Sequence, residues 1–304
     1  MYYLRRIALI PPLLLLISLA AFLLVRVAPG GPFDRDRKPA SPQVRAALEA
    51  KYHLDEPVWR QYLRYLGGLV QGDLGPSLKY RAHTVNDIIA QGLPISLVLG
   101  VLAFGLAIGV GVPSGFYSAV RRGHWSDYGI TLLTLVAICV PGFLIGPILV
   151  MVLAIELRWF PVALAETPWH FVLPTLSLGL FFAGKVARMM REGTLQTLQL
   201  DFINTARAKG LPETQVLLKH VLRLAILPVV SYSGPLLADL LTGSFVVENI
   251  FQIPGIGVFM VNSSLNRDYP LIVGLVLLYA VLLVVLNLVV DFFYSWLDPR
   301  VRYE

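Results

Sequence analysis

Long apolar runs alternate with polar intervals along the whole chain. A hydrocarbon core about 30 Å thick needs roughly 20 helical residues, and all but one of the runs clearly reach this length. The run before Lys185 is shorter, but it can span the bilayer if Lys185 and Arg188 extend their charged groups to the interface. The pattern therefore predicts an all-α polytopic membrane protein with six transmembrane helices. They are expected at residues 7–25, 95–120, 128–155, 171–187, 224–247 and 271–297.

The first apolar run resembles the core of a secretory signal, because Arg5 and Arg6 precede it. A signal has an apolar core of about 7 to 15 residues before a small-residue cleavage site. This run is longer and ends at Arg26 and Pro29 without such a site. Residues 1–29 are therefore predicted to form a retained transmembrane helix.

The next segment, residues 30–93, has the mixed charges and turn signals of a soluble region. Proline begins two stretches in it, and proline is favoured in the first turn of a helix. In the second stretch apolar residues recur at three- and four-residue spacing, which is typical of an amphipathic helix. We expect two amphipathic helices on the outer membrane face. The predicted helices are residues 42–54 and 57–70, and the predicted turns are residues 39–42 and 72–76.

Basic residues fall mainly on one side of a six-span arrangement. Cytoplasmic loops carry an excess of Lys and Arg, whereas loops longer than about 60 residues translocate regardless of charge. The short loops on the opposite side hold only Arg158 and Arg267. This bias predicts that both termini are cytoplasmic and that residues 30–93 are external. The cytoplasmic basic residues are Arg5, Arg6, Arg121, Arg122, Lys185, Arg188, Arg191, Arg207, Lys209, Lys219, Arg223, Arg300 and Arg302.

The remaining residues, 94–304, are predicted to form a five-helix core. Glycine and proline inside its apolar runs are typical of close-packed, locally broken membrane helices. The single cysteine, Cys139, excludes a disulfide within the chain, and we expect it to be a small core residue. The glycines and prolines are Gly105, Gly109, Gly111, Pro141, Pro174, Gly234 and Pro235.

A basic polar interval at about residues 191–223 interrupts this core. Residues 196–208 are predicted to form a short helix, and Gly210 stands where a helix stops in the left-handed conformation. Pro212 can then occupy the first turn of the next helix. Two helices should therefore meet at an elbow on the cytoplasmic surface. The alternative is an amphipathic interfacial helix without a protein partner.

Composition supports a membrane protein and argues against a nucleic-acid-binding one. Of the 304 residues, 56% are hydrophobic and 14% are charged, whereas about a quarter of the residues in a soluble domain are charged. The net charge of +6 is spread between apolar runs and does not cluster on one face, so it reflects membrane topology better than nucleic-acid binding.

The sequence offers no catalytic centre. Gly179–Lys185 matches the phosphate-binding loop motif, but the next residue is not the Ser or Thr that should bind magnesium. The stretch also lies within an apolar run. An intramembrane hydrolase would need a nucleophile facing a base, and none of the five histidines falls centrally in a span. We therefore expect no ATP hydrolysis, bound cofactor or metal in this chain.

A polar face is predicted on the fifth span, where Ser231, Pro235, Asp239 and Thr242 fall within about 80° at roughly 100° per residue. A carboxylate in a membrane helix is costly unless it meets a polar cavity or a partner. This face is a candidate lining of a translocation cavity. The alternative is that Asp239 pairs with a basic residue on another helix.

The segment after this span, residues 247–257, contains proline and glycine that make a continuous helix unfavourable. It should fold as a turn or re-entrant loop packed against protein. An ordinary interhelical loop is the alternative.

Several motifs resemble those of peptide and nickel permeases of ABC importers. Asn204-Thr205-Ala206 with Gly210 and Leu227-Pro228 is similar to their cytoplasmic EAA loop, although Asn204 and Thr205 replace its Glu-Ala. Residues 248–257 are similar to their Glu-x-Ile-Phe-x-x-Pro-Gly-x-Gly element. Further similarity lies at residues 50–54, 72–77, 85–87, 265–269 and 298–300.

The resemblance implies a B-type permease subunit of an ABC oligopeptide importer with the type I fold, in a bacterial inner membrane. Its partners would be a second permease subunit, two cytoplasmic ATPases that hold ATP and magnesium, an external peptide-binding protein, lipid and the peptide. Other cargoes, a dipeptide or a nickel chelate, stay open. A self-sufficient channel or secondary transporter would carry its own ion site, often at an internal repeat, and no clear repeat is seen.

The resemblance also assigns residues to two roles. The ATPase-coupling loop would comprise Phe202, Ile203, Asn204, Thr205, Ala206, Arg207, Lys209 and Gly210. The external gate or loop would comprise Glu248, Phe251, Pro254, Gly255 and Gly257.

Overall fold

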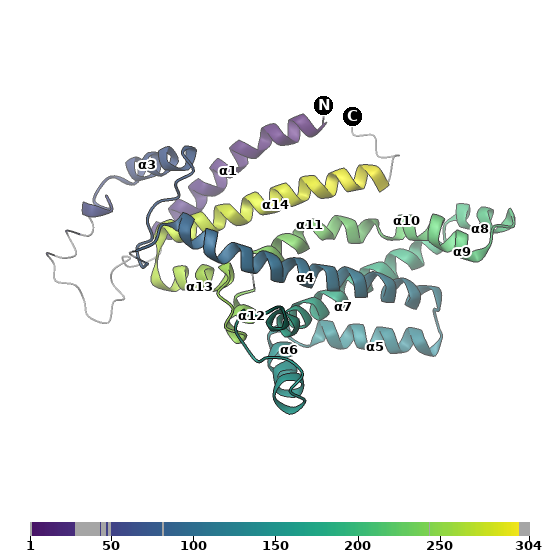
Figure 1. The fold of residues 1–304 in the computed structure, drawn as a ribbon. Coiled ribbons are helices and arrows are strands. Elements are labelled where there is room, and N and C mark those ends of the chain that lie inside the picture. Colours follow the sequence, from purple (N-terminus) through teal and green to yellow (C-terminus); the bar gives the residue numbers. More distant parts are fainter. Residues whose placement is uncertain are drawn as a thin grey trace. The chain divides into compact units, whose positions relative to one another are not determined.

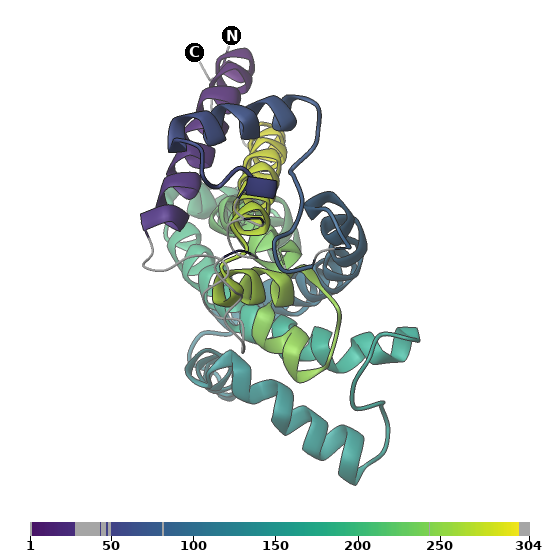
Figure 2. The same ribbon diagram turned by 90° about the vertical axis from the view of Figure 1, so that its left-hand side faces the viewer.

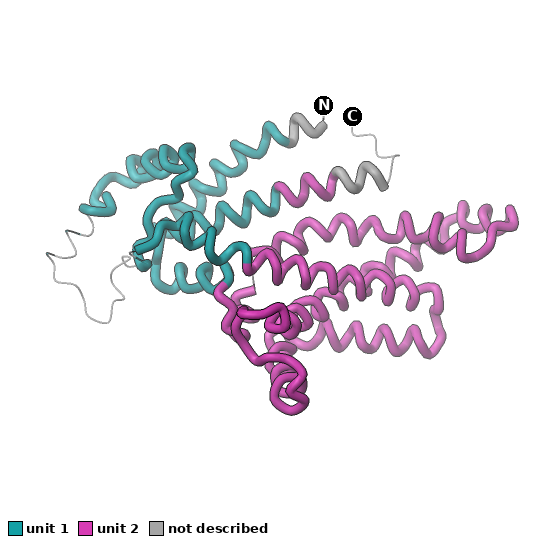
Figure 3. The backbone as a smooth tube through the Cα atoms, viewed as in Figure 1, with its two compact units in different colours: residues 1–94, 255–284 teal, residues 95–254, 285–304 magenta. Residues whose placement is uncertain are grey.

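The computed structural model describes residues 2–27, 43, 47, 50–80, 82–242 and 244–297. These residues are predominantly helical, as Figure 1 and Figure 2 show, which confirms the predicted all-α class. Six of the thirteen residues of the predicted helix at 42–54 lie outside the described residues, as do the turn at 39–42 and the motif at 298–300. The chain forms two compact units (Figure 3). Unit 1 is residues 1–94 and 255–284, and unit 2 is residues 95–254 and 285–304.

The membrane helices confirm five of the predicted spans. Among the described residues, five helical stretches are long and apolar enough to cross a bilayer. They occur in α1 (Tyr2–Val27), α4 (Val85–Val120), Pro168–Leu198 with α7 (Val172–Leu198), Leu227–Ile250 with α11 (Leu227–Leu241) and α12 (Phe245–Ile250), and α14 (Tyr269–Leu297).

The remaining predicted span is not a straight helix. The helix α5 (Trp125–Cys139) stops before Pro141, and α6 (Gly142–Leu149) continues as a π-helical segment, Val150–Glu156. The two halves are bent by 102°. Val140 has extended angles, φ −72° and ψ 120°, because a residue before proline avoids the helical region. The predicted local break at Pro141 is confirmed, and the predicted span at 128–155 is formed by two helices that meet at this break.

Two helices run beyond the apolar stretches that identified them. The helix α4 begins at Val85 instead of residue 95 and continues through Pro94, and α7 ends at Leu198 instead of residue 187. The length of an apolar run indicates only the length of the helical part that lipid can surround. A helix can extend past the lipid wherever its residues pack on protein, so composition alone underestimates its length.

The core of unit 2 is built around α7, which packs against α5, α6, α11 and α10 (Leu222–Ala225). Its buried residues run along its whole length, from Leu173 to Thr197. The helix α4 also approaches it closely, since a Cβ atom on Gly115 would lie 2.1 Å from the Ala187 carbonyl oxygen. Small residues of this kind let membrane helices come into backbone contact.

Close packing does not extend to every predicted position. A Cβ atom on Gly105 or Gly109 would have no described atom within 4 Å, so these two glycines are not close-packed within the described part of the chain. Cys139 is exposed, and its assignment to the core was wrong. The helix α5 contacts α7 along one side only, and Cys139 is on a face that the described residues leave uncovered.

In unit 1 the ends of three helices pack together. Ala21 and Phe22, near the C-terminal end of α1, contact Val273 and Leu277 of α14. The first turn of α4 packs on the start of α14 and on α13 (Ile256–Asn266) through a second apolar cluster. The C-terminal end of α1 and the N-terminal ends of α4 and α14 therefore lie at the same end of this unit.

The segment predicted to be external also belongs to unit 1. Its helix α3 (Val58–Val70) confirms the predicted amphipathic helix, and Pro57 directly precedes it. It packs against α1 through Tyr62 and Tyr65, whose rings lie 5.1 and 6.0 Å from that of Phe22. The predicted turn at 72–76 is confirmed, since Gly72 and Gly75 have φ values of 76° and 90°.

Candidate functional site

The elbow of the polar interval is formed by α8 (Asp201–Ala208) and the short helix α9 (Glu213–Gln215), which Figure 1 shows at one end of α7 and α10. The predicted single helix at 196–208 is wrong. The helix α7 ends at Leu198, and Leu200 is extended, with φ −77° and ψ 140°. This break redirects the chain so that α8 starts as a separate element.

The turn after α8 confirms the left-handed conformation predicted for Gly210, whose φ is 76°. Its N–H donates to the Arg207 carbonyl at 2.9 Å. A Cβ atom on Gly210 would meet no described atom within 4 Å, so the requirement for glycine here is conformational. Pro212 lies one position before α9 and not in its first turn as predicted.

One face of α8 is buried and the other is exposed. Ile203 and Ala206 are buried in the core of unit 2 with Val216 and Val221. Phe202 is 40% exposed, and Thr205 is exposed as well. Phe202 and Ile203 are the two large apolar residues of the predicted coupling loop, and either could anchor a contact with a partner. Because Ile203 is fully buried within this chain, only Phe202 remains available. Asn204, Arg207 and Lys209 are also exposed.

An ion pair closes the elbow. The Nε and Nη2 atoms of Arg207 donate to the two carboxylate oxygens of Glu213 at 3.1 and 2.7 Å. This bond lowers the pKa of Glu213 and raises the pKa of Arg207. Since both side chains are well exposed, the pair contributes at most about 1 kcal/mol. Sequence analysis assigned Arg207 to the coupling loop but did not indicate its partner across the turn.

The base of the elbow is anchored by tight packing and by a buried acid. A Cβ atom on Gly193 of α7 would lie 2.6 Å from the Ala225 carbonyl oxygen of α10. Arg191 of α7 donates to both carboxylate oxygens of Asp127 at 3.0 Å. Asp127 also accepts from Ser118 Oγ at 2.6 Å. The turn between α4 and α5 is thereby fixed to α7, a link that the sequence did not indicate.

The candidate polar face of α11 is a continuous face in the structure. Ser231 and Asp239 are exposed, and Pro235 and Thr242 are half-buried. The opposite side of the helix is buried. The Ser231 and Thr242 hydroxyls donate to helix carbonyls at 3.1 and 3.0 Å, so their oxygens stay available as acceptors. Residues buried on the opposite side are Val229, Leu236, Leu240 and Leu241.

The segment after α12 folds as the predicted turn. Ile253 N–H donates to the Glu248 carbonyl at 2.8 Å, and Gln252 has a φ of 51°. The Glu248 side chain is fully buried and accepts from Ser96 Oγ at 2.7 Å. Phe251 is 1% exposed, and its carbonyl accepts from Leu164 N–H at 2.8 Å. Glu248 and Phe251 therefore hold this turn in the core of unit 2.

The other candidate gate residues differ from one another in burial. Pro254 is exposed, and Gly255 and Gly257 are buried in unit 1. Gly255 directly precedes α13, and Gly257 lies in its first turn. Sequence reasoning missed α13, because proline and glycine lie at its start and its 11 residues are too few to form a membrane-spanning run.

The phosphate-loop-like stretch has no site geometry. Gly179 and Gly184 are buried within the continuous helix α7, and Lys185 Nζ lies 4.5 Å from the centroid of the Phe181 ring. Across the described residues, no group of three or more His, Cys, Asp or Glu side chains is placed to hold a metal ion.

Comparisons with relatives extend over nearly the whole chain, and those with a family model and a solved structure over about two thirds of it. Residues 111–303 match the family model for a "Binding-protein-dependent transport system inner membrane component". The oligopeptide transport system permease protein OppB of Haemophilus influenzae is 41% identical over 98% of this chain and 98% of its own. The dipeptide transport system permease protein DppB of Bacillus subtilis is 39% identical over 99% and 97%. A solved structure of the MetNI methionine ABC transporter, inward-facing, has a TM-score of 0.58 at 16% identity, over 69% of this chain and 96% of that one.

Proposed function

Because the chain belongs to the family of binding-protein-dependent transport system inner membrane components, we propose that it forms half of the translocation pathway of an ATP-driven oligopeptide importer. The fold is that of the type I importer permeases, as predicted. The observation that carries the proposal is the 41% identity with an oligopeptide permease along almost the full length of both chains. The exposed elbow supplies the surface that such a subunit needs toward an ATPase.

The topology follows from unit 1 together with the order of the helices. The C-terminal end of α1 and the N-terminal ends of α4 and α14 pack together, so they belong at one membrane surface. The chain must then cross an even number of times between Val85 and Tyr269. The spans in α4, α7 and α11–α12 supply three crossings, so the bent pair at Pro141 supplies the fourth. This supports six crossings with both termini on one side, and the bias of the basic residues in the sequence favours the cytoplasm of a bacterial inner membrane for that side.

The elbow is proposed as the contact with a cytoplasmic ATPase. The exposed Phe202 ring would enter a groove on that subunit, and Lys209 would lie at the rim of the contact. Arg207 is already paired with Glu213, so it stabilises the elbow more than it attracts the partner. ATP and magnesium would be held by two ATPase subunits, and this chain would hydrolyse nothing.

The exposed face of α11 is proposed as the lining of the translocation cavity. It presents hydroxyl oxygens and the Asp239 carboxylate, which suit the amine or backbone N–H groups of a peptide. In the alternative, Asp239 pairs with a basic group. The second permease subunit would complete the cavity, and an external binding protein would deliver the peptide. ATP binding would bias the pair between two states.

The cargo is proposed to be an oligopeptide. The relatives that support this include one named for dipeptide transport, so dipeptides are the second candidate and a nickel chelate the third. A self-sufficient channel or secondary transporter is less well supported, because it would not need the elbow.

Deleting this chain and measuring uptake of defined peptides tests the proposal. Loss of oligopeptide uptake, restored by the intact chain, is expected, together with co-purification of ATPase subunits. Normal peptide uptake in the deletion strain, or purification of an active transporter without an ATPase, would reject it.

A further inference from the structure

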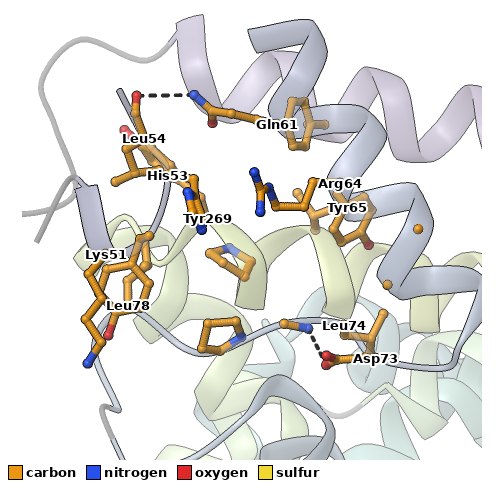
Figure 4. Close-up of a pocket in the computed structure, with 18 of the residues that line it drawn as sticks. Lys51, His53, Leu54, Gln61, Arg64, Tyr65, Asp73, Leu74, Leu78 and Tyr269 are labelled. Atoms are coloured by element: carbon orange, nitrogen blue, oxygen red, sulfur yellow. Dashed lines mark hydrogen bonds between the residues drawn. The ribbon is translucent and has the colours of Figure 1, made fainter. Parts of the chain in front are cut away.

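A cavity of about 590 Å³ within unit 1 is lined by residues of α1, α3 and α14 (Figure 4). Arg64 in its lining pairs with Glu56 at 2.7 Å. Arg26 donates to the Gln61 side-chain oxygen at 2.6 Å. Because these cations have partners within the chain, we assign no ligand to the cavity. The transport role leaves a second feature unexplained, a loop of unit 2 that is bonded to the candidate external gate.

This loop lies between the third predicted span and α7, and we call residues 157–167 the strap. All of them are described, and they form no regular secondary structure between the π-helical segment Val150–Glu156 and the short helix Pro168–Phe171. Phe160 and Ala165 are half-buried and pack against the apolar cluster of unit 2 that contains Phe251. The strap therefore covers part of the core that holds the turn after α12.

The turn after α12, residues 248–253, ends that helix without a glycine, and we call it the gate turn. Ile253 N–H donates to the Glu248 carbonyl at 2.8 Å, as in a Schellman motif, whose left-handed residue is usually glycine. Here that residue is Gln252, with a φ of 51°. On the core side the buried Glu248 carboxylate accepts from Ser96 Oγ at 2.7 Å. The gate turn is thus held firmly to the core.

One backbone hydrogen bond fastens the strap to the gate turn. Leu164 N–H donates to the Phe251 carbonyl at 2.8 Å. Leu164 has a φ of 83°, although its side chain is 45% exposed. A positive φ is unfavourable for a bulky residue. In the described part of the chain five non-glycine residues have a positive φ, and three of them, Arg158, Leu164 and Gln252, lie in the strap or the gate turn. Backbone strain is therefore concentrated at this contact.

Strain on both sides of one hydrogen bond indicates a contact that is made in one state and released in another. Strained residues persist only where the surrounding structure holds them, and they cluster at clamps and switch regions. Within the described residues, the Leu164–Phe251 bond is the one backbone hydrogen bond that joins the middle of the strap to another element. When this bond breaks, Leu164 can return to an ordinary φ. The strain therefore lowers the free energy that release of the strap requires.

We propose that the strap is an outer gate of the permease, which opens when Leu164 leaves the Phe251 carbonyl. This inference rests on the proposed transport function, whose topology places the strap and the gate turn on the external side. Glu248 and Phe251 stay in the core while the strap moves away. Because opening relieves the strain at Leu164, ATP binding and the loaded binding protein need to supply less free energy to shift the equilibrium between the two states.

Two cysteines measure the distance between the strap and the gate turn. Glu166→Cys and Asn249→Cys, both at exposed positions, are combined with Cys139→Ser in the complete transporter and spin-labelled. The resting transporter should show a short distance, and a longer one should appear with loaded binding protein and trapped ATP. An unchanged distance in a transporter that takes up peptide would overturn the gate. Uptake by the unlabelled variant is measured in parallel, so that failure of the gate is distinguished from failure of the proposed function.

The same pair of cysteines can lock the strap. A short bifunctional thiol reagent that joins them should abolish peptide uptake and leave basal ATP hydrolysis intact. A longer reagent should permit uptake, and so should the short reagent on either single-cysteine variant. Native uptake by the fully cross-linked transporter, or an equal loss with the longer reagent, would overturn the proposal.

Three variants test the role of strain. Leu164→Asn keeps the N–H and introduces a residue that tolerates the left-handed conformation, so the separated fraction should fall about fivefold. Leu164→Pro removes the N–H and fixes φ near about −65°, so the strap should separate even without ATP. Val162→Asn is the matched control, because Val162 is 47% exposed and has no positive φ, and it should behave like the native protein. An unchanged or larger separated fraction in Leu164→Asn, or an equal fall in Val162→Asn, would refute the role of strain.

Discussion

Replacing Phe202 with alanine should uncouple the permease from its ATPase while leaving the permease folded. The ring is 40% exposed, and a phenylalanine has about 200 Å² to bury, so docking would remove about 80 Å² of apolar surface from water. At about 25 cal/mol per Å² this is worth about 2 kcal/mol. Affinity for the ATPase subunits should therefore fall about 30-fold.

Replacing the neighbouring residue, Ile203, should reduce the stability of the permease more than its affinity for the ATPase. Ile203 is fully buried in the core of unit 2, and a large-to-small change there costs about 2–5 kcal/mol of folding free energy. Ile203→Ala should lower the amount of inserted permease. The fraction that does insert should bind its ATPase better than Phe202→Ala does, because the exposed ring is still present.

Reconstituted vesicles separate these effects. ATPase binding, ATP hydrolysis stimulated by loaded binding protein, and peptide uptake are measured at equal amounts of permease. Phe143→Ala is the control, because it removes a ring that is even more exposed, 54% against 40%, from α6 outside the elbow. Native coupling in Phe202→Ala would refute the elbow as the contact, and an equal loss in Phe143→Ala would show that the effect is not specific.

Three further changes test the other conclusions. Gly210→Val should insert normally but lose ATP-driven uptake, because a side chain strains the left-handed turn by about 1–2 kcal/mol and re-aims α8; full uptake would show that the turn is not needed. In a Cys139→Ser background, cysteine at Lys79 should react with an impermeant thiol reagent from outside and cysteine at Gln215 should not, whereas the reverse pattern rejects the topology. Asp239→Asn should reduce uptake of cationic peptides more than neutral ones; unchanged uptake of both would exclude the cavity role.

The sequence predicted the membrane helices well, because the length of an apolar run is a local property that decides whether a helix can cross lipid. The stop at Gly210 was also predictable, since few residues other than glycine adopt its φ of 76°. The break at Pro141 was foreseen, but its bend of 102° depends on how both halves pack on α7.

Other parts of the site depend on contacts that no local pattern contains. Phe202 and Ile203 are adjacent apolar residues, and only the packing of α8 on the core decides which one is exposed. The pairs Arg207–Glu213 and Arg191–Asp127 join residues that meet after the chain folds back. Cys139 looked like a core residue because the sequence cannot tell a face toward lipid from a face toward protein.

The length of α7 has a mechanical consequence. Its 27 residues form an unbroken rod about 40 Å long, and the elbow begins two residues after its end. A tilt of about 5° at one end would displace the other by about 3.5 Å. Because α5, α6, α10 and α11 all pack on this rod, we expect a small displacement of α8 to be transmitted through α7 to the far end of unit 2 without any helix having to unfold.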